Sequence, residues 1–127
     1  LMADESIWTP QDAIKLHDYE ACDYLNLKIA KTCGLNRGKK VESVAEALGF
    51  PCIVGTELEP GISSVAKIHL AASMAIHPLA SEFTELSQLD GSILNNPIKI
   101  NDGCLRVPEG PGFGVTINEK SLEKFKL

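Results

Sequence analysis

The chain has 127 residues, of which 44% are hydrophobic, so it is long enough to form one soluble domain with an ordinary core. Its formal net charge of −5 and its scattered lysines argue against a nucleic-acid-binding surface. No stretch approaches the roughly 18 apolar residues that a membrane-spanning helix needs, so we expect no membrane partner. The weakly acidic composition is typical of a cytoplasmic protein.

The cysteines form no C-x-x-C pair and match no zinc-binding spacing. We therefore expect free thiols in a reducing compartment and no disulfide framework. The positions concerned are Cys22, Cys33, Cys52 and Cys104. Residues 1–6 form an apolar run that soon becomes acidic, which predicts the end of a strand and not a signal peptide.

The first elements alternate between strand and helix patterns. After a strand that ends near Asp4, Thr9 and Pro10 have the residue types of a helix N-cap and a first helical position. These residues predict a helix that continues to about Tyr19. Apolar and polar residues then alternate over 24–29, which is the period of a strand.

The alternation of strands and helices continues through the middle of the chain. Apolar residues recur at helical spacing over 36–48, and the short apolar run 50–54 is typical of a strand buried on both faces. A further helix is predicted over 61–78, followed by a weaker strand over 79–85. Because the strand ends recur about every 24 to 30 residues, we expect consecutive βα units in an α/β fold with a parallel sheet.

The last third of the chain has a different pattern. Segments 97–100 and 104–107 are predicted to form two short strands of a β-hairpin, joined by an Asp-Gly turn. A short helix is expected over 121–127, with Asn118 as its N-cap.

Functional side chains of βα barrels lie at the carboxyl ends of the strands. Asp4 and Glu5 follow the first predicted strand, and carboxylate oxygens suit Mg²⁺ or Mn²⁺, with a solvated turn as the alternative. Lys28, or Lys31 just past it, ends the second strand, and Lys28 has apolar neighbours. Burial and a nearby cation can lower the pKa of such a lysine and make it an acid or base, whereas an edge-strand lysine that discourages aggregation is the alternative. Lys31 lies past this strand end, so we expect its removal to cost little.

Acidic residues also follow the two later strands. Glu57 and Glu59 follow the third predicted strand, and either Glu82 or Glu85 ends the fourth. On the same rule, these carboxylates are candidates for substrate binding or acid–base chemistry.

Several motifs occur in a fixed order that resembles a known family. They are Ala3–Ser6, Leu27–Lys31 with Gly34 and Leu35, Gly55–Glu59 with Gly61 and Ile62, His69–Ala72, Thr84–Leu86 and Val107–Val115. In this order and at these spacings they resemble the muconate lactonizing enzyme (muconate cycloisomerase) subgroup of the enolase superfamily. The resemblance extends over essentially the whole chain.

The resemblance implies a fold and a division of the chain. Residues 1–96 would form the C-terminal half of a (β/α) barrel, about strands five to eight. Residues 97–127 would be a C-terminal extension that packs on a capping domain. The function implied is proton abstraction or delivery next to a carboxylate of a small substrate, with Mg²⁺ or Mn²⁺ stabilising the charge that develops.

The resemblance also assigns roles to particular residues. Asp4 resembles the third carboxylate ligand of the metal, and Lys28 resembles the acid/base lysine of strand six. Glu57 and Glu59 would lie near the substrate on strand seven. Glu85 resembles the acidic catalytic residue of strand eight.

Other features of the family have no counterpart here. Two further metal ligands, a second lysine and the capping domain are missing from these residues, so we expect the isolated chain to be inactive, to bind metal weakly and to self-associate as a homo-oligomer. Residues 82–85 lack the Asp-x-Asp of dipeptide epimerases, which favours a cycloisomerase or an uncharacterised racemase. A racemase, epimerase or dehydratase of the same superfamily, and a non-catalytic self-associating half-barrel, are the alternatives.

Overall fold

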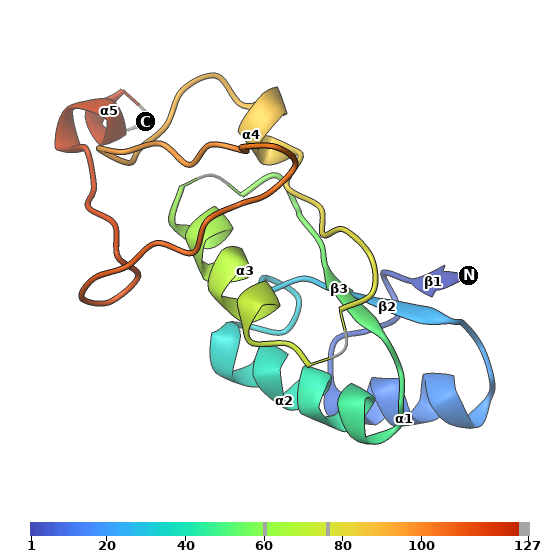
Figure 1. Cartoon of the computed structure of the whole chain (residues 1–127). Helices are drawn as coiled ribbons and strands as arrows, with labels where there is room; N and C mark the ends of the chain where they lie inside the picture. Colours follow the sequence, from blue (N-terminus) through green and yellow to red (C-terminus); the bar gives the residue numbers. More distant parts are fainter. Residues whose placement is uncertain (60, 76, 125–127) are drawn as a thin grey trace.

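A three-stranded parallel sheet organises the first half of the molecule. In the computed structural model, which describes residues 1–59, 61–75 and 77–124, the strands β1 (Met2–Ala3), β2 (Tyr24–Leu27) and β3 (Cys52–Val54) lie in the order β1-β2-β3 (Figure 1). Each strand is followed by a helix, as the alternating pattern predicts. The α/β class and the parallel sheet are therefore confirmed.

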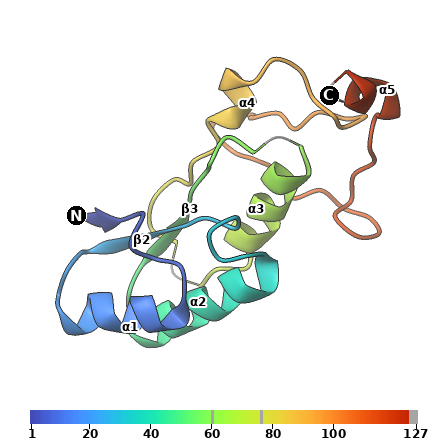
Figure 2. The same cartoon turned by 180° about the vertical axis from the view of Figure 1, so that it is seen from behind.

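The helices that follow the strands lie beside one another. α1 (Pro10–Asp18) and α2 (Leu35–Ala47) pack together on one side of the sheet, and α3 (Ile62–Ala72) lies next to α2 and β3 (Figures 1 and 2). Parallel strands need such helical crossovers because the chain must return to the same end of the sheet each time.

The start of α1 confirms the local prediction in detail. The Thr9 hydroxyl accepts a hydrogen bond from the Asp12 amide at 3.3 Å, and the Asp12 carboxylate accepts one from the Thr9 amide at 2.9 Å. This reciprocal capping box satisfies amides that the first turn of a helix leaves without partners, and Pro10 follows at the first helical position.

The apolar core lies between the sheet and these helices. One cluster joins β1 and β2 to α1 and α2, and a second joins the end of β3 to α3. Buried members of the first cluster are Ala3, Ile7, Ala13, Leu25, Leu27, Val41, Ala45, Phe50 and Cys52. Those of the second are Ile29, Val54, Ala66 and Leu70. All four cysteines are free thiols, as expected.

The prediction of a strand over 79–85 is wrong. The segment runs beside β3 but forms only two hydrogen bonds with it: Val54 N–H donates to Ser81 Oγ at 3.0 Å, and Glu82 N–H donates to Val54 O at 2.9 Å. Because a side-chain hydroxyl takes the place of a backbone partner, no strand ladder forms, and the short helix α4 (Glu85–Gln88) follows.

The preceding helix, α3, is also shorter than the predicted 61–78. It ends at Ala72, where the Ser73 hydroxyl donates to the Leu70 carbonyl at 2.7 Å and competes with the next helical bond.

The predicted hairpin is reduced to its turn. Asn101 and Cys104 exchange two backbone hydrogen bonds of 2.9 Å around Asp102 and Gly103, both with positive φ, as an Asp-Gly turn requires. The described flanking residues form no strands. Ile100 is 53% exposed, so apolar packing does not support a pair of strands that would be marginal by itself.

The C-terminal segment folds back on the earlier part of the molecule (Figure 2). Leu94 forms a bridge with Ile117, and the His69 ring lies 5.8 Å from that of Phe113. Asn118 caps α5 (Glu119–Glu123) by accepting from the Ser121 amide, as predicted. Residues 125–127 of the expected helix lie outside the described residues. None of the helices in the described part of the chain has the length and apolar character to cross a membrane.

Candidate active site

The candidate site lies where β1 and β2 end side by side. Asp4 follows β1, Lys28 follows β2, and the Nζ atom of Lys28 lies 2.8 and 3.0 Å from the two carboxylate oxygens of Asp4. The Nζ atom of Lys31 lies 2.8 Å from Asp4 Oδ1 and donates to the Asp4 carbonyl oxygen at 2.6 Å. Parallel neighbouring strands bring these distant positions to one edge of the sheet.

The two lysines are buried and share the same carboxylates. The side chains of Lys28 and Lys31 are 9% and 2% exposed, and the exposed Glu5 carboxylate lies 3.5 and 3.6 Å from their Nζ atoms. Lys31, whose removal was expected to cost little because it lies past the strand end, contacts the same aspartate. Its side chain folds back from the turn after β2 to the aspartate that Lys28 contacts.

The charges of this cluster stabilise one another. Burial opposes the charge of Lys28, but its hydrogen bond to Asp4 and the negative charges of Asp4 and Glu5 outweigh burial and raise the pKa of Lys28. Burial also raises the pKa of Asp4, but hydrogen bonds from Lys28 and Lys31 outweigh it, so that pKa is lowered. The direction for Lys28 is opposite to the one that burial alone would give.

A second polar pair lies on the same face of β2. Asn26 precedes Lys28 by two residues, so the alternation of the strand turns both side chains to one side. Asn26 is 2% exposed and its Nδ2 donates to Glu82 Oε2 at 3.3 Å. Its Oδ1 atom is buried without a partner among the described residues. A Cβ atom on Gly55 would lie 2.1 Å from this oxygen, so a larger residue there would require the Asn26 amide to move.

The acidic residues after β3 occupy a compact loop. The Glu59 carboxylate accepts from the Glu57 amide at 2.8 Å and from the Thr56 hydroxyl at 3.3 Å. Burial raises the pKa of Glu59, but hydrogen bonds from the Glu57 and Glu59 amides, the charge of Lys67 and the bond from the Thr56 hydroxyl outweigh it, and the pKa is lowered. Glu57 itself is exposed.

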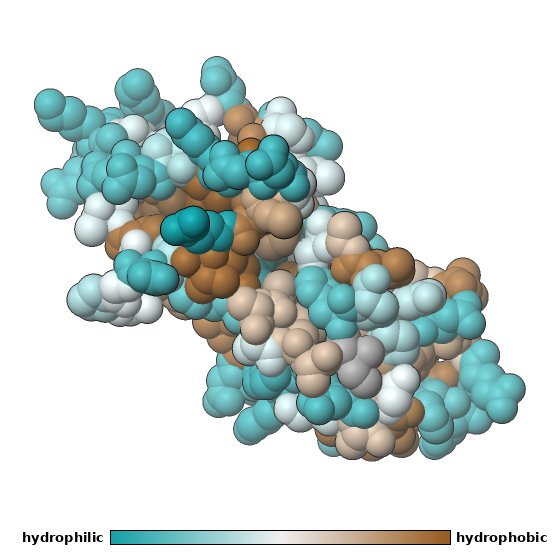
Figure 3. Space-filling model, viewed as in Figure 1, coloured by the Kyte–Doolittle hydropathy of each residue, from teal (hydrophilic) through white to brown (hydrophobic). Residues whose placement is uncertain are grey.

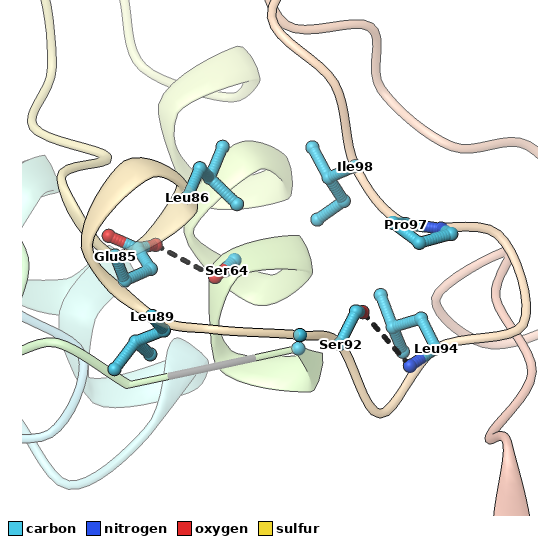
Figure 4. A pocket seen from close by; sticks show the side chains of 10 residues that line it. Ser64, Glu85, Leu86, Leu89, Ser92, Leu94, Pro97 and Ile98 are labelled. Carbon is cyan, nitrogen blue, oxygen red and sulfur yellow. Dashed lines mark hydrogen bonds between the residues drawn. The ribbon is translucent and has the colours of Figure 1, made fainter. Parts of the chain in front are cut away.

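Glu85 begins α4 and does not end a strand. Its carboxylate is buried: Oε1 accepts from Lys67 Nζ at 2.6 Å and from Ser64 Oγ at 2.7 Å, and Oε2 accepts from Thr56 Oγ1 at 2.8 Å. Figure 4 shows Glu85 turned toward Ser64 of α3 at one wall of a cavity of about 240 Å³ whose other walls are mainly apolar. The catalytic role of Glu85 stays a prediction.

Residues 1–121 match the sequence profile of the family described as enolase C-terminal domain-like. The chain belongs to this family. It is 36% identical over 123 residues to muconate cycloisomerase 1 of Rhodococcus opacus, covering 97% of this chain and 33% of that enzyme. It is 33% identical over 121 residues to the L-Ala-D/L-Glu epimerase of Clostridium acetobutylicum, covering 91% and 32% of the two chains.

Solved structures give the same relationship for this enolase C-terminal domain-like chain. The 2-chloromuconate cycloisomerase of Rhodococcus opacus 1CP has a TM-score of 0.92 at 32% identity, over 99% of this chain and 34% of that one. The muconate lactonizing enzyme of Pseudomonas putida has a TM-score of 0.90 at 34% identity, over 98% and 34%. The chain thus spans about a third of the length of these relatives. The resemblance to muconate cycloisomerases is confirmed.

The metal ion that membership of the enolase superfamily implies does not fit this segment by itself. Within residues 1–59, 61–75 and 77–124, no group of three or more His, Cys, Asp or Glu side chains is placed to hold one. The carboxylate of Asp4 contacts Lys28 and Lys31 through its oxygens. The segment can offer one carboxylate ligand, but it does not build a site.

Sequence reasoning missed Asn26 and Lys67 and did not anticipate the contact of Lys31 with Asp4. A signal for each was present. Asn26 interrupts an apolar strand on the side of Lys28, and Lys67 interrupts an apolar stretch of α3. A polar residue buried in an element needs a partner, so each position indicated a polar contact in the fold.

Proposed function

We propose that this chain forms part of the active site of an isomerase that moves a proton at the carbon next to a carboxylate, within a longer protein. The observation that carries the proposal is the contact between Lys28 and Asp4, whose carboxylate and ammonium lie within 3.0 Å at the ends of adjacent parallel strands. The isomerase names of the relatives support it.

Lys28 is proposed as the acid/base residue. Its buried stem and its bonds to Asp4 fix the position of the ammonium at the strand end, and a positioned lysine of this kind can deliver or accept a proton. The substrate class that fits is a small carboxylate, because removal of a proton next to a carboxylate leaves an anion that a nearby cation can stabilise.

The metal dependence of the longer protein is also a proposal. Asp4 would supply one oxygen ligand to Mg²⁺ or Mn²⁺, and the other ligands would come from outside these residues. When bound, the ion would stabilise negative charge on the substrate carboxylate. Asp4 itself would hold the ion and would also keep the ammonium groups of Lys28 and Lys31 beside it.

A partial (β/α) barrel is the proposed architecture of residues 1–96, with 97–127 as an extension. The βα order and the likeness to cycloisomerase structures support it. Glu57 and Glu59 are proposed to face the substrate. Glu82 and Glu85 are the two candidates for the acidic residue that follows the fourth predicted strand. Glu82 is proposed as the one that lies on the same side of β2 as Lys28, because it contacts Asn26, whereas Glu85 is bonded to Lys67.

A dipeptide epimerase is the second candidate function. The 33% identity to an L-Ala-D/L-Glu epimerase favours it, and the same lysine and aspartate would serve it. The absence of an Asp-x-Asp over residues 82–85 favours a cycloisomerase instead. A non-catalytic half-barrel is the remaining alternative, and the same experiment separates the three.

The test uses the full-length protein that contains this segment. Muconate, 2-chloromuconate and L-Ala-L-Glu are offered in deuterated water, and deuterium at the carbon next to a carboxylate is measured. Lys28→Ala should lower the rate of incorporation by about a hundredfold or more, the usual scale for a positioned acid or base. Lys28→Arg should not restore it, because guanidinium stays protonated and has another shape.

Lys15→Ala is the control, because Lys15 is exposed on α1. It should leave incorporation unchanged. Lys31→Ala should reduce incorporation as well, because Lys31 contacts Asp4. Full incorporation in Lys28→Ala would show that the acid/base assignment is wrong, and no incorporation with any probe in the parent would favour the non-catalytic alternative.

A further inference from the structure

A second cavity lies between the segment that enters α1 and the first turns of α2. Its volume is about 390 Å³, which is within the range of small-molecule sites in proteins. Trp8 and Pro10 line it at the start of α1, and Arg37 and Lys40 line it on α2. It shares no lining residue with the cavity of Figure 4. We call it the Trp8 cavity.

The lining of the Trp8 cavity is basic. Arg37 and Lys40 are three residues apart on α2, so the helix turns both side chains to one side. Both are exposed, and neither forms an ion pair among the described residues. None of the described residues that line the cavity is acidic, although the whole chain has a net charge of −5. This part of the surface therefore favours an anion.

The carboxylates closest in sequence to Trp8 are already bonded. Asp12 accepts from the Thr9 hydroxyl at 2.8 Å and from the Thr9 amide at 2.9 Å within the capping box. The Glu5 carboxylate faces the ammonium groups of Lys28 and Lys31. Neither carboxylate is paired with a cation of the Trp8 cavity other than Lys31, so Arg37 and Lys40 keep their capacity to bind an anion.

Trp8 gives the cavity an aromatic wall of fixed orientation. Its Nε1 atom donates to the Glu5 carbonyl oxygen at 2.8 Å, and its amide donates to the Asp12 carboxylate at 3.2 Å. The polar atom of the indole is therefore satisfied, yet Trp8 is 49% exposed. The ring surface that remains offers apolar and π contact, which suits the flat face of another ring.

The inner side of the Trp8 cavity is set by the fold. Val41 and Thr32, which are 0% and 2% exposed, line it there. Val41 belongs to the core cluster, and the Thr32 hydroxyl donates to the Lys28 carbonyl oxygen at 3.3 Å. A preformed wall of this kind, with a few polar groups at the rim, is typical of small-molecule sites.

We propose that the Trp8 cavity binds a small aromatic carboxylate, with its ring against Trp8 and its carboxylate at Arg37 and Lys40. A guanidinium can donate two parallel hydrogen bonds to a carboxylate, and an ammonium adds a point charge. This site goes beyond the proposed function, because neither Lys28 nor Asp4 lines it. The alternative is that another segment of the longer protein fills the cavity.

The test titrates the full-length protein with phenylacetate and follows Trp8 by fluorine NMR after incorporation of 5-fluorotryptophan. Trp8→Phe identifies the resonance of Trp8 by its loss. Phenylacetate should shift this resonance with a Kd of about 1 to 10 mM, the affinity expected of so small a ligand. Phenylacetamide has nearly the same shape without the charge, so it should bind about tenfold more weakly or worse.

Two variants test the basic residues of the cavity. Arg37→Gln and Lys40→Gln should each weaken phenylacetate binding by about threefold to tenfold, because each removes one charged partner of the carboxylate. Both side chains are exposed, so both variants should fold. Lys15→Gln is the matched control, because Lys15 is exposed on α1 and does not line the cavity, and it should bind phenylacetate as the parent does.

Three results would overturn the proposal. Equal binding of phenylacetamide would show that the cavity does not select an anion. An unchanged Kd in both Arg37→Gln and Lys40→Gln would show that the carboxylate is bound elsewhere. No shift of the Trp8 resonance at several times the expected Kd would favour the alternative, in which the longer protein fills the cavity. These measurements need no turnover, so their outcome is independent of the proposed function.

Discussion

Lys28 and Lys67 are both buried lysines, but their sequence neighbourhoods differ in how much they indicate. Lys28 follows a segment of alternating pattern, so its place at the carboxyl end of a strand could be predicted. Lys67 lies between Ala66 and Ile68 on a helix, where a lysine more often reaches solvent along its stem. The partner that makes burial tolerable, Glu85, lies 18 positions away, and no local pattern indicates that contact.

The thiol of Cys52 should be the least reactive of the four. Cys52 is 2% exposed, and burial together with the charge of Glu42 raises its pKa to about 12. At pH 8 only about one thiol in ten thousand would be a reactive thiolate. Treatment of the native full-length protein with a thiol reagent, followed by mass spectrometry, should modify Cys104 well before Cys52.

Denaturant should remove this difference, because unfolding exposes every cysteine. The exposed Cys104 is the internal reference for reagent activity. Equal native rates at the two positions would contradict the buried placement of Cys52.

At the scale of elements, local sequence signals predicted where helices begin better than where helices and strands end. Thr9 and Asn118 mark helix starts because a cap is a contact between residues three apart, which sequence displays directly. The segment 79–85 depends instead on how it meets β3, where the Ser81 side chain takes a backbone position. The Asp-Gly turn formed without its strands, because strands need packing that the turn cannot supply.

The capping box of α1 predicts a pH-dependent contribution to stability. Burial raises the pKa of Asp12, but bonds from the Thr9 side chain and the Thr9 and Trp8 amides outweigh it and lower the pKa below its ordinary 3.8. A carboxyl with a lowered folded-state pKa stabilises above its unfolded pKa, and the contribution is lost as pH falls through the folded value. Asp12→Ala should therefore lower the urea midpoint of the full-length protein at pH 7 more than at pH 3.

Thr9→Ala should lower the free energy of unfolding by about 1 kcal/mol at pH 7, the usual cost of removing an N-cap. Gln11→Ala, at a neighbouring exposed position, is the control and should have little effect.

The Asp12→Ala prediction has its own contradicting outcome. A decrease of the urea midpoint that is as large at pH 3 as at pH 7 would show that the charge of the Asp12 carboxylate is not responsible.

At the scale of the whole molecule, the sheet has an open side. β1 consists of Met2 and Ala3 and pairs only with β2 among the described residues. Its outer edge therefore presents backbone groups that seek partners. Apolar side chains also gather over α3 and the adjoining C-terminal segment (Figure 3), and Leu58, Ile62 and Leu89 are 45%, 40% and 38% exposed.

We therefore expect the isolated 127-residue chain to self-associate or to lack stable order. Sedimentation velocity over a micromolar concentration series should give a weight-average mass above that of the 13.7 kDa monomer, or far-ultraviolet circular dichroism should show little helix. The full-length protein, in which the edge would be covered, is the comparison. A monodisperse chain that unfolds cooperatively as a monomer would contradict this expectation.

The contact between Gly55 and Asn26 restricts how this sequence can change. The space that a methyl group at position 55 would need is taken by the amide of Asn26, 2.1 Å away. Substitutions at the two positions are therefore coupled: a larger residue at 55 requires either that the Asn26 side chain move or that residue 26 first become smaller. The order of substitutions, and not only their identity, would decide which descendants keep a folded strand edge beside Lys28.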